Sequence, residues 1–113
     1  MKLHKKFNHD LPGVHVWGER GEVDIRINFG TFRAGEVFHP DPKHYHNDRT
    51  TYFCVLDGML IVEVEGKEII VNQDAMLEVS SMEVYRTIGV GGQGCIFVVI
   101  GSHNKPSRIV VEN

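Results

Sequence analysis

Two histidines separated by one residue, His44 and His46, are the part of this sequence best suited to chemistry. Side chains two residues apart on a β-strand point to the same face of the sheet. Two imidazoles that converge in this way suit a divalent metal ion, and either one can also act as an acid or a base. The spacing therefore predicts a site on a strand at residues 44–46, with a bound metal or with polar groups that bind a ligand or water without one.

The segment after this pair has the pattern of a strand and a turn. The hydrophobic run Tyr52–Leu56 ends at Asp57-Gly58, which is typical of a strand that enters a hairpin. Apolar and polar residues alternate at positions 23–29, which indicates another half-buried strand. Further strands are predicted at 60–65, 69–71, 75–77, 96–100 and 108–111. Turn residues recur about every 8–12 positions between these runs, the spacing of a sandwich or barrel.

Four glycines are concentrated between positions 89 and 94. No helical pattern follows them, so no helix N-terminus is available to bind a phosphate. We therefore expect a flexible hairpin loop in this segment. Because no window of the sequence has the period of an amphipathic helix, we expect an all-β chain.

Size, charge and cysteine content narrow the class of protein. A chain of 113 residues corresponds to a single domain, 1–113. Its net charge of −3 argues against nucleic acid as the main partner, and no signal peptide or membrane segment is evident. Cys54 and Cys95 both lie in apolar runs, which favours buried free thiols in a reducing, cytoplasmic setting over a disulfide or redox pair.

Between positions 33 and 100 the sequence resembles the cupin superfamily. The resemblance rests on Gly35, the histidine pair, the predicted strand and turn at 52–58, and Asp74-Ala75-Met76 at the start of a second motif. It implies an all-β double-stranded β-helix, or jelly-roll barrel. The motif region is then about 33–100, with terminal strands at 11–17 and 108–111.

The resemblance also implies a metal site, of which this sequence has half. In cupins the first motif supplies two histidines and a glutamate and the second supplies one histidine, and together they hold Fe, Mn, Ni or Zn. His44 and His46 match the pair, but the glutamate position falls on Thr51 and the last histidine position on Val84. Additional ligands could come from Glu83 and His39. A bound divalent ion and the absence of any cofactor both stay open.

Three functions follow from the resemblance. The first is a metal-assisted oxygenase, isomerase or decarboxylase that acts on a small polar acid or sugar. The second is a ligand-binding or sensing cupin without enzymatic activity. The third is a metal-free enzyme similar to sugar epimerases, with His44 or His46 as base and Tyr85 as acid. The catalytic candidates are thus these three residues, and the expected substrate contacts are Tyr85, Arg86 and Thr51.

The sequence further predicts a homodimer. Apolar residues occupy both faces of some predicted strands, as where Ile61 lies between Leu60 and Val62, and the edges of a small sheet need protection. The terminal segments 11–17 and 108–111 are the expected contributors to the interface, with the alternative that both fold back on their own sheet.

Overall fold

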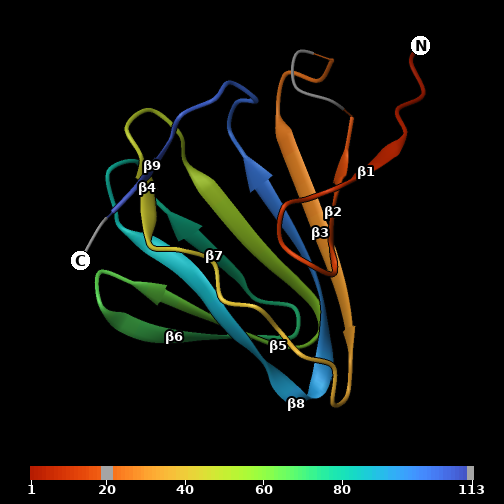
Figure 1. The fold of residues 1–113 in the computed structure, drawn as a ribbon, viewed down its shortest axis with the longest axis vertical. Coiled ribbons are helices and arrows are strands. Elements are labelled where there is room, and N and C mark those ends of the chain that lie inside the picture. Colours follow the sequence, from red (N-terminus) through yellow and green to blue (C-terminus); the bar gives the residue numbers. More distant parts are fainter. Residues whose placement is uncertain (19–21, 112–113) are drawn as a thin grey trace.

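The computed structural model describes residues 1–18 and 22–111, and this part of the chain contains nine β-strands and no helix (Figure 1). The strands are β1 (Lys6–Asn8), β2 (Val14–Trp17), β3 (Arg26–Arg33), β4 (His44–His46), β5 (Thr51–Val64), β6 (Lys67–Asn72), β7 (Met76–Val79), β8 (Tyr85–Gly101) and β9 (Arg108–Val110). The all-β prediction is confirmed. Within the described ranges there is accordingly no helix that could cross a lipid bilayer.

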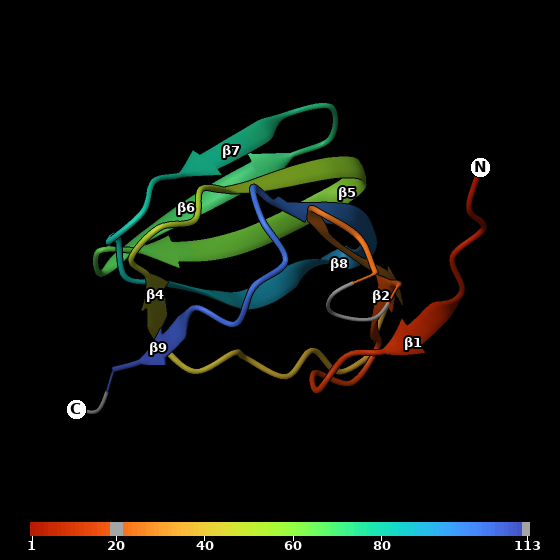
Figure 2. The same cartoon turned by 90° about the horizontal axis from the view of Figure 1, so that it is seen from above.

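Two long strands, β5 and β8, form the centre of the sheet and pair antiparallel along most of their length. β8 also pairs with β3 and β4, whereas β5 also pairs with β6 and β7. The strand order β1-β2-β3-β8-β4-β9 completes the path. Figure 2 shows the sheet curled, with β5, β6 and β7 along one side and the segment between β3 and β4 along the opposite side. The curl encloses the interior in which the histidine pair lies.

β5 runs without interruption through Asp57-Gly58, so the hairpin turn predicted there is wrong. The buried side chains of β5 fall on odd positions up to Val55 and on even positions from Leu60, because the register with β8 shifts on both sides of Gly58. Gly58 has a φ of 77°, and a Cβ at this position would overlap the carbonyl oxygen of Gly94. A glycine-containing β-bulge therefore takes the place of the turn.

The glycine-rich segment 89–94 lies inside β8, so the hairpin loop predicted for it is also wrong. At its start Gly89 and Val90 pair with β5, and at its end Gly94 pairs with β3. Gly94 pairs with Arg33, and a Cβ on Gly94 would overlap the carbonyl oxygen of Phe32. Gly94, together with Gly58 of β5, therefore allows the backbones of β3, β8 and β5 to approach one another more closely than residues with side chains would permit.

The hydrophobic core fills the interior next to the histidine pair. Its buried members are Val14, Phe32, Phe53, Val55, Leu60, Val62, Val71, Val79, Tyr85, Cys95 and Phe97. Both cysteines are free thiols, and burial raises the pKa of Cys95 to about 11. A thiol with this pKa is protonated at neutral pH and serves as a small apolar group.

Both terminal segments pair within the chain. β1 and β2 form a hairpin that continues the sheet from β3, and β9 pairs with β4. Trp17 stacks on Phe29 of β3, with 4.1 Å between the ring centroids. Residues 11–17 and 108–111 thus complete their own sheet, and the homodimer stays a prediction that rests on the remaining exposed edges and apolar side chains.

Candidate functional site

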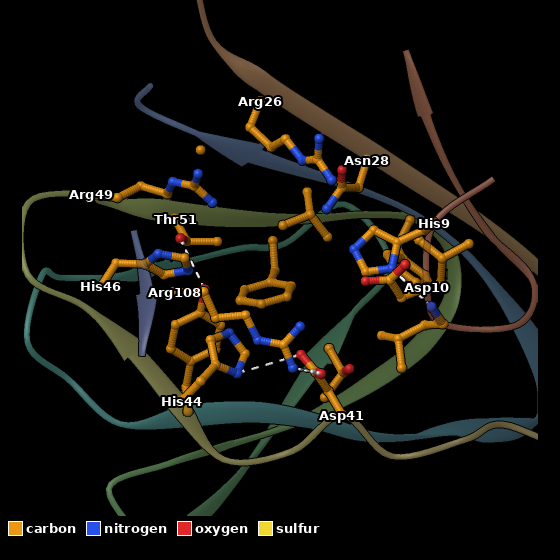
Figure 3. A pocket seen from close by; sticks show the side chains of 18 residues that line it. His9, Asp10, Arg26, Asn28, Asp41, His44, His46, Arg49, Thr51 and Arg108 are labelled. Atoms are coloured by element: carbon orange, nitrogen blue, oxygen red, sulfur yellow. Dashed lines mark hydrogen bonds and ion pairs between the residues drawn. The ribbon is translucent and has the colours of Figure 1, made fainter. Parts of the chain in front are cut away.

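The histidine pair lies on β4, a three-residue strand held between β8 and β9. His44 and His46 are each only 4% exposed, and their ring centroids are 5.5 Å apart with the rings perpendicular. Both side chains line the same interior pocket (Figure 3), as the two-residue spacing predicts.

The pocket is a cavity of about 110 Å³ at the open side of the curled sheet. Its apolar wall comes from the core, including Phe53 and Phe97. Polar side chains from several strands and loops surround the remainder (Figure 3), namely His9, Asp10, Arg26, Asn28, Asp41, His44, His46, Arg49, Thr51, Tyr85, Thr87 and Arg108. A pocket of this composition suits a small polar ligand.

The tautomer of His44 is fixed by its neighbours. Nδ1 lies 2.8 Å from the carbonyl oxygen of Pro42 and 3.4 Å from Oδ2 of Asp41. Because a carbonyl oxygen only accepts, Nδ1 carries the proton and donates it, which leaves a lone pair on Nε2. Burial lowers the pKa of His44 and outweighs the hydrogen bond to Pro42, which raises it. His44 is therefore a neutral base at neutral pH.

His46 is neutral for a related reason. Burial, followed by the positive charge of Arg49, lowers its pKa to about 4. Nδ1 of His46 shares a hydrogen bond of 2.7 Å with Oγ of Ser107, in the segment that leads into β9. This bond orients the ring from the side opposite β8.

Tyr85 is the third side chain of this group. Its ring centroid lies 4.4 Å from that of His44 and 6.1 Å from that of His46, and its hydroxyl is 3.1 Å from the hydroxyl of Thr51. Burial raises the pKa of Tyr85, so the phenol keeps its proton. The family spacing assigned the inward position to Val84, but in the structure Tyr85 occupies it. The backbone N–H of Val84 donates to Oε1 of Glu65.

Three arginines that the sequence pattern did not single out also line the pocket. Arg49 is 8% exposed, and its Nη2 donates to the carbonyl oxygen of Lys105 at 3.0 Å. Arg108 donates to Oδ1 of Asp41 at 2.7 Å, and Arg26 reaches the pocket from β3. A signal was present, since Arg49 shares the two-residue period of the inward positions 51 and 53.

Three residues expected at the site lie elsewhere. The side chain of Arg86 is bound to Glu63, with 3.2 Å between Nε and Oε1, and does not line the pocket. Glu83 closes a turn, where its Oε1 accepts a hydrogen bond from the backbone N–H of Ser80. His39 is exposed in the segment before β4. The structure thus does not bring Arg86, Glu83 or His39 to the pocket, and their roles as substrate contact and as metal ligands stay predictions.

The donor set does not fit the metal cage of the family. Among the described residues, no group of three or more His, Cys, Asp or Glu side chains could hold an ion. Thr51 and Tyr85, which stand beside the two imidazoles, offer neutral hydroxyls. Arg49 and Arg108 line the same cavity, and their positive charges oppose a further cation there. Two imidazoles alone would leave most coordination positions to water.

Comparison with known proteins relates the chain by structure rather than by sequence. No family model and no curated protein matches the sequence. A Klebsiella pneumoniae protein with a double-stranded β-helix domain aligns over 80% of this chain and 76% of its own, with a TM-score of 0.65 and 14% identity.

Two enzymes align in the same way. An oxalate oxidase in complex with glycolate is 20% identical, with a TM-score of 0.64 over 95% of this chain, which spans 60% of the oxidase. A cupin-superfamily sugar phosphate isomerase from Silicibacter pomeroyi is 14% identical, with a TM-score of 0.66 over 89% of this chain and 67% of the isomerase. Together with the strand pairing, these matches show that the protein has the double-stranded β-helix fold of the cupins.

Proposed function

We propose that the protein is an enzyme that moves protons on a small polar organic molecule, with His44 as base and Tyr85 as acid. The observation that carries this proposal is the fixed tautomer of His44. Its Nδ1 donates to the carbonyl oxygen of Pro42, so Nε2 keeps the lone pair that a base requires. Tyr85 packs against the same ring and carries the proton that an acid requires.

The proton transfers can be written in full. Nε2 of His44 takes a proton from a carbon beside a carbonyl group, while the Tyr85 hydroxyl gives its proton to the carbonyl oxygen. The substrate becomes a neutral enol, His44 an imidazolium and Tyr85 a phenolate. Arg49 and Arg108 both favour the phenolate by their charge, and Thr51 stays hydrogen-bonded to its oxygen. Transfer of the proton from His44 to the neighbouring carbon, with return of the enol proton of that carbon to Tyr85, gives the isomeric carbonyl compound and restores both side chains.

The structural neighbours support a small polar substrate. One neighbour is named a sugar phosphate isomerase. Another is an oxalate oxidase in complex with glycolate. The pocket of this chain suits such a substrate, since eleven of its eighteen lining residues have ionisable or hydroxyl side chains. At these low identities the likeness concerns the fold, and the chemistry is argued from His44 and Tyr85.

The test is solvent hydrogen exchange. Glyceraldehyde, dihydroxyacetone, glycolaldehyde and pyruvate are incubated with the protein in D₂O, and loss of the C–H signal beside the carbonyl is followed by NMR. We expect exchange above the uncatalysed rate on at least one compound, lowered at least about 100-fold by His44→Gln or Tyr85→Phe, the size of a general acid–base contribution. His39→Gln and Tyr45→Phe are matched controls outside this pair.

Other outcomes would favour the alternatives. Binding of these compounds without exchange would favour a ligand-binding or sensing cupin. Exchange that appears only after Mn²⁺, Fe²⁺, Ni²⁺ or Zn²⁺ is added would favour a metal-assisted enzyme that uses His44 and His46. Exchange that persists unchanged in both variants would remove them from the reaction.

A further inference from the structure

We infer that Arg26 and Arg49 form a carboxylate-binding subsite at one end of the pocket, and that the molecule bound there is a short organic acid. This inference rests on the proposed function for the identity of the site and adds the substrate class. The supporting observation is that the side chains of Arg26 and Arg49 both pack next to Gly101, which has no side chain of its own.

Gly101 is the point at which the two arginines meet. It is the last residue of β8 and pairs with Arg26 of β3 on one side and with Thr51 of β5 on the other. A Cβ on Gly101 would lie 2.9 Å from Cδ of Arg49 and 3.2 Å from Cβ of Arg26. The missing side chain therefore makes the room in which both arginine stems enter the pocket.

The position of Arg49 makes the subsite more than a surface patch. More than nine-tenths of this residue is buried, so its charge acts inside the pocket with little screening by solvent. One nitrogen donates to the carbonyl oxygen of Lys105 and holds the side chain in place. The guanidinium group is planar and presents donors in a fork that matches the two oxygens of a carboxylate.

The charges in the pocket favour an anion at this end. Asp41 lies on the opposite wall from Arg26 and Arg49 (Figure 3), where it pairs with Arg108. His44 and His46 are neutral. The positive side chains of the lining are therefore the three arginines, and the negative ones are Asp10 and Asp41. Asn28 adds a side-chain amide beside Arg26 on the same wall (Figure 3). A carboxylate placed between Arg26 and Arg49 would be attracted by both positive charges.

The size of the cavity limits the rest of the ligand. A closed cavity of about 150 Å³ accommodates a benzene molecule, and the pocket measures about 110 Å³. It therefore holds an acid of two or three carbons, with its carboxylate between the arginines and its other end near His44 and Tyr85. Larger substrates would extend through the open side of the pocket.

The test compares two probes of equal size. Glycolate and glycolamide have the same number of non-hydrogen atoms, but only glycolate carries a charge. By isothermal titration calorimetry at pH 7.5 we expect glycolate to bind at least 10-fold more tightly than glycolamide. Arg49→Gln and Arg26→Gln should each weaken glycolate at least 10-fold. Arg33→Gln, which removes the same charge from an exposed position on β3, should leave binding unchanged.

The two variants and a third probe make the result decisive. Arg26 is half-buried, so Arg26→Gln tests the subsite even where the loss of Arg49 unfolds the protein. Equal binding of the two probes, no binding of glycolate at 20 mM, or binding that is insensitive to Arg26→Gln would overturn the inference. Orthophosphate that binds more tightly than glycolate with the same dependence on Arg26 would identify a phosphate site instead. Binding of glycolate that depends on Arg26, in a protein that exchanges no C–H proton of the test compounds, would support the subsite and remove the proton-transfer proposal, so the two failures are distinguishable.

Discussion

The lowered pKa of His46 predicts a specific loss of stability in mild acid. In the unfolded chain the imidazole has its ordinary pKa of 6.5, whereas in the folded protein burial and Arg49 lower it to about 4. Between these two values the unfolded chain binds a proton that the folded protein does not. Stability therefore rises with pH across this window and is lost as the pH falls from 6.5 to 4.

The magnitude follows from the two pKa values. One pKa unit corresponds to about 1.4 kcal/mol, so the difference between 6.5 and about 4 corresponds to roughly 3 kcal/mol. That is a large share of the 5–15 kcal/mol by which proteins are typically stable. His44 and His9 also have pKa values lowered by burial and add to the loss in the same direction. The share of His46 must therefore be measured against a variant that lacks it.

Urea denaturation from pH 4 to 7.5 measures this share. The single tryptophan, Trp17, is stacked on Phe29 in the folded protein and reports unfolding by fluorescence. We expect the free energy of unfolding of wild type to fall by about 3 kcal/mol more than that of His46→Gln between pH 7.5 and pH 4. His39→Gln, at an exposed position, should follow wild type. Parallel curves for His46→Gln and wild type, or an NMR titration of His46 near 6.5, would refute the reasoning.

Three further changes test the packing around the site. Tyr85→Phe should lower the free energy of unfolding by about 1–3 kcal/mol, because it leaves the buried Thr51 hydroxyl without its partner. The double variant Tyr85→Phe/Thr51→Val should lose less stability than the sum of the two single changes, and strict additivity in this double-mutant cycle would contradict the hydrogen bond. Gly58→Ala should destabilise by more than about 1 kcal/mol, since its φ is positive and its Cβ meets backbone, whereas Gly92→Ala in open space should change thermal unfolding little; equal effects would show that the bulge tolerates a side chain. In the double variant Tyr85→His/Thr51→Glu, added Zn²⁺ should raise the Tm, because the two changes add two inward ligands beside the histidines. The same rise in a variant with Val84→His in place of Tyr85→His would contradict the inward position of Tyr85.

The sequence identified the histidine pair because its signal is local. A spacing of two on a strand needs no knowledge of the partner strands. The two mistaken turns have a different origin. Asp57-Gly58 and the glycines at 89–94 have the composition of turns, and only the pairing of β5 with β8, two segments far apart in the sequence, makes both of them parts of long strands. No window of the sequence contains that information.

The remaining site residues were missed for two reasons. Counting along the family motif placed Val84 inside, but Met82 adopts a φ of 73° in a tight turn and the residue that enters the barrel is Tyr85. Arg49 lies among polar residues, Asn47 to Thr50, a composition typical of a solvated loop rather than of a pocket wall. Its side chain packs over Gly101, which ends β8 and lies more than 50 positions later in the chain.

The pairing of β5 with β8 has a consequence for how the protein folds. Thr51 is paired with Gly101, 50 residues later in the chain, so the pocket closes only after a long loop has lost its freedom. The hairpin of β5 and β6 needs only the two residues between Val64 and Lys67 and can form early. Chains dominated by distant pairings fold in milliseconds to seconds. We therefore expect ligand-binding competence to appear in the slowest refolding phase, after most of the sheet has formed.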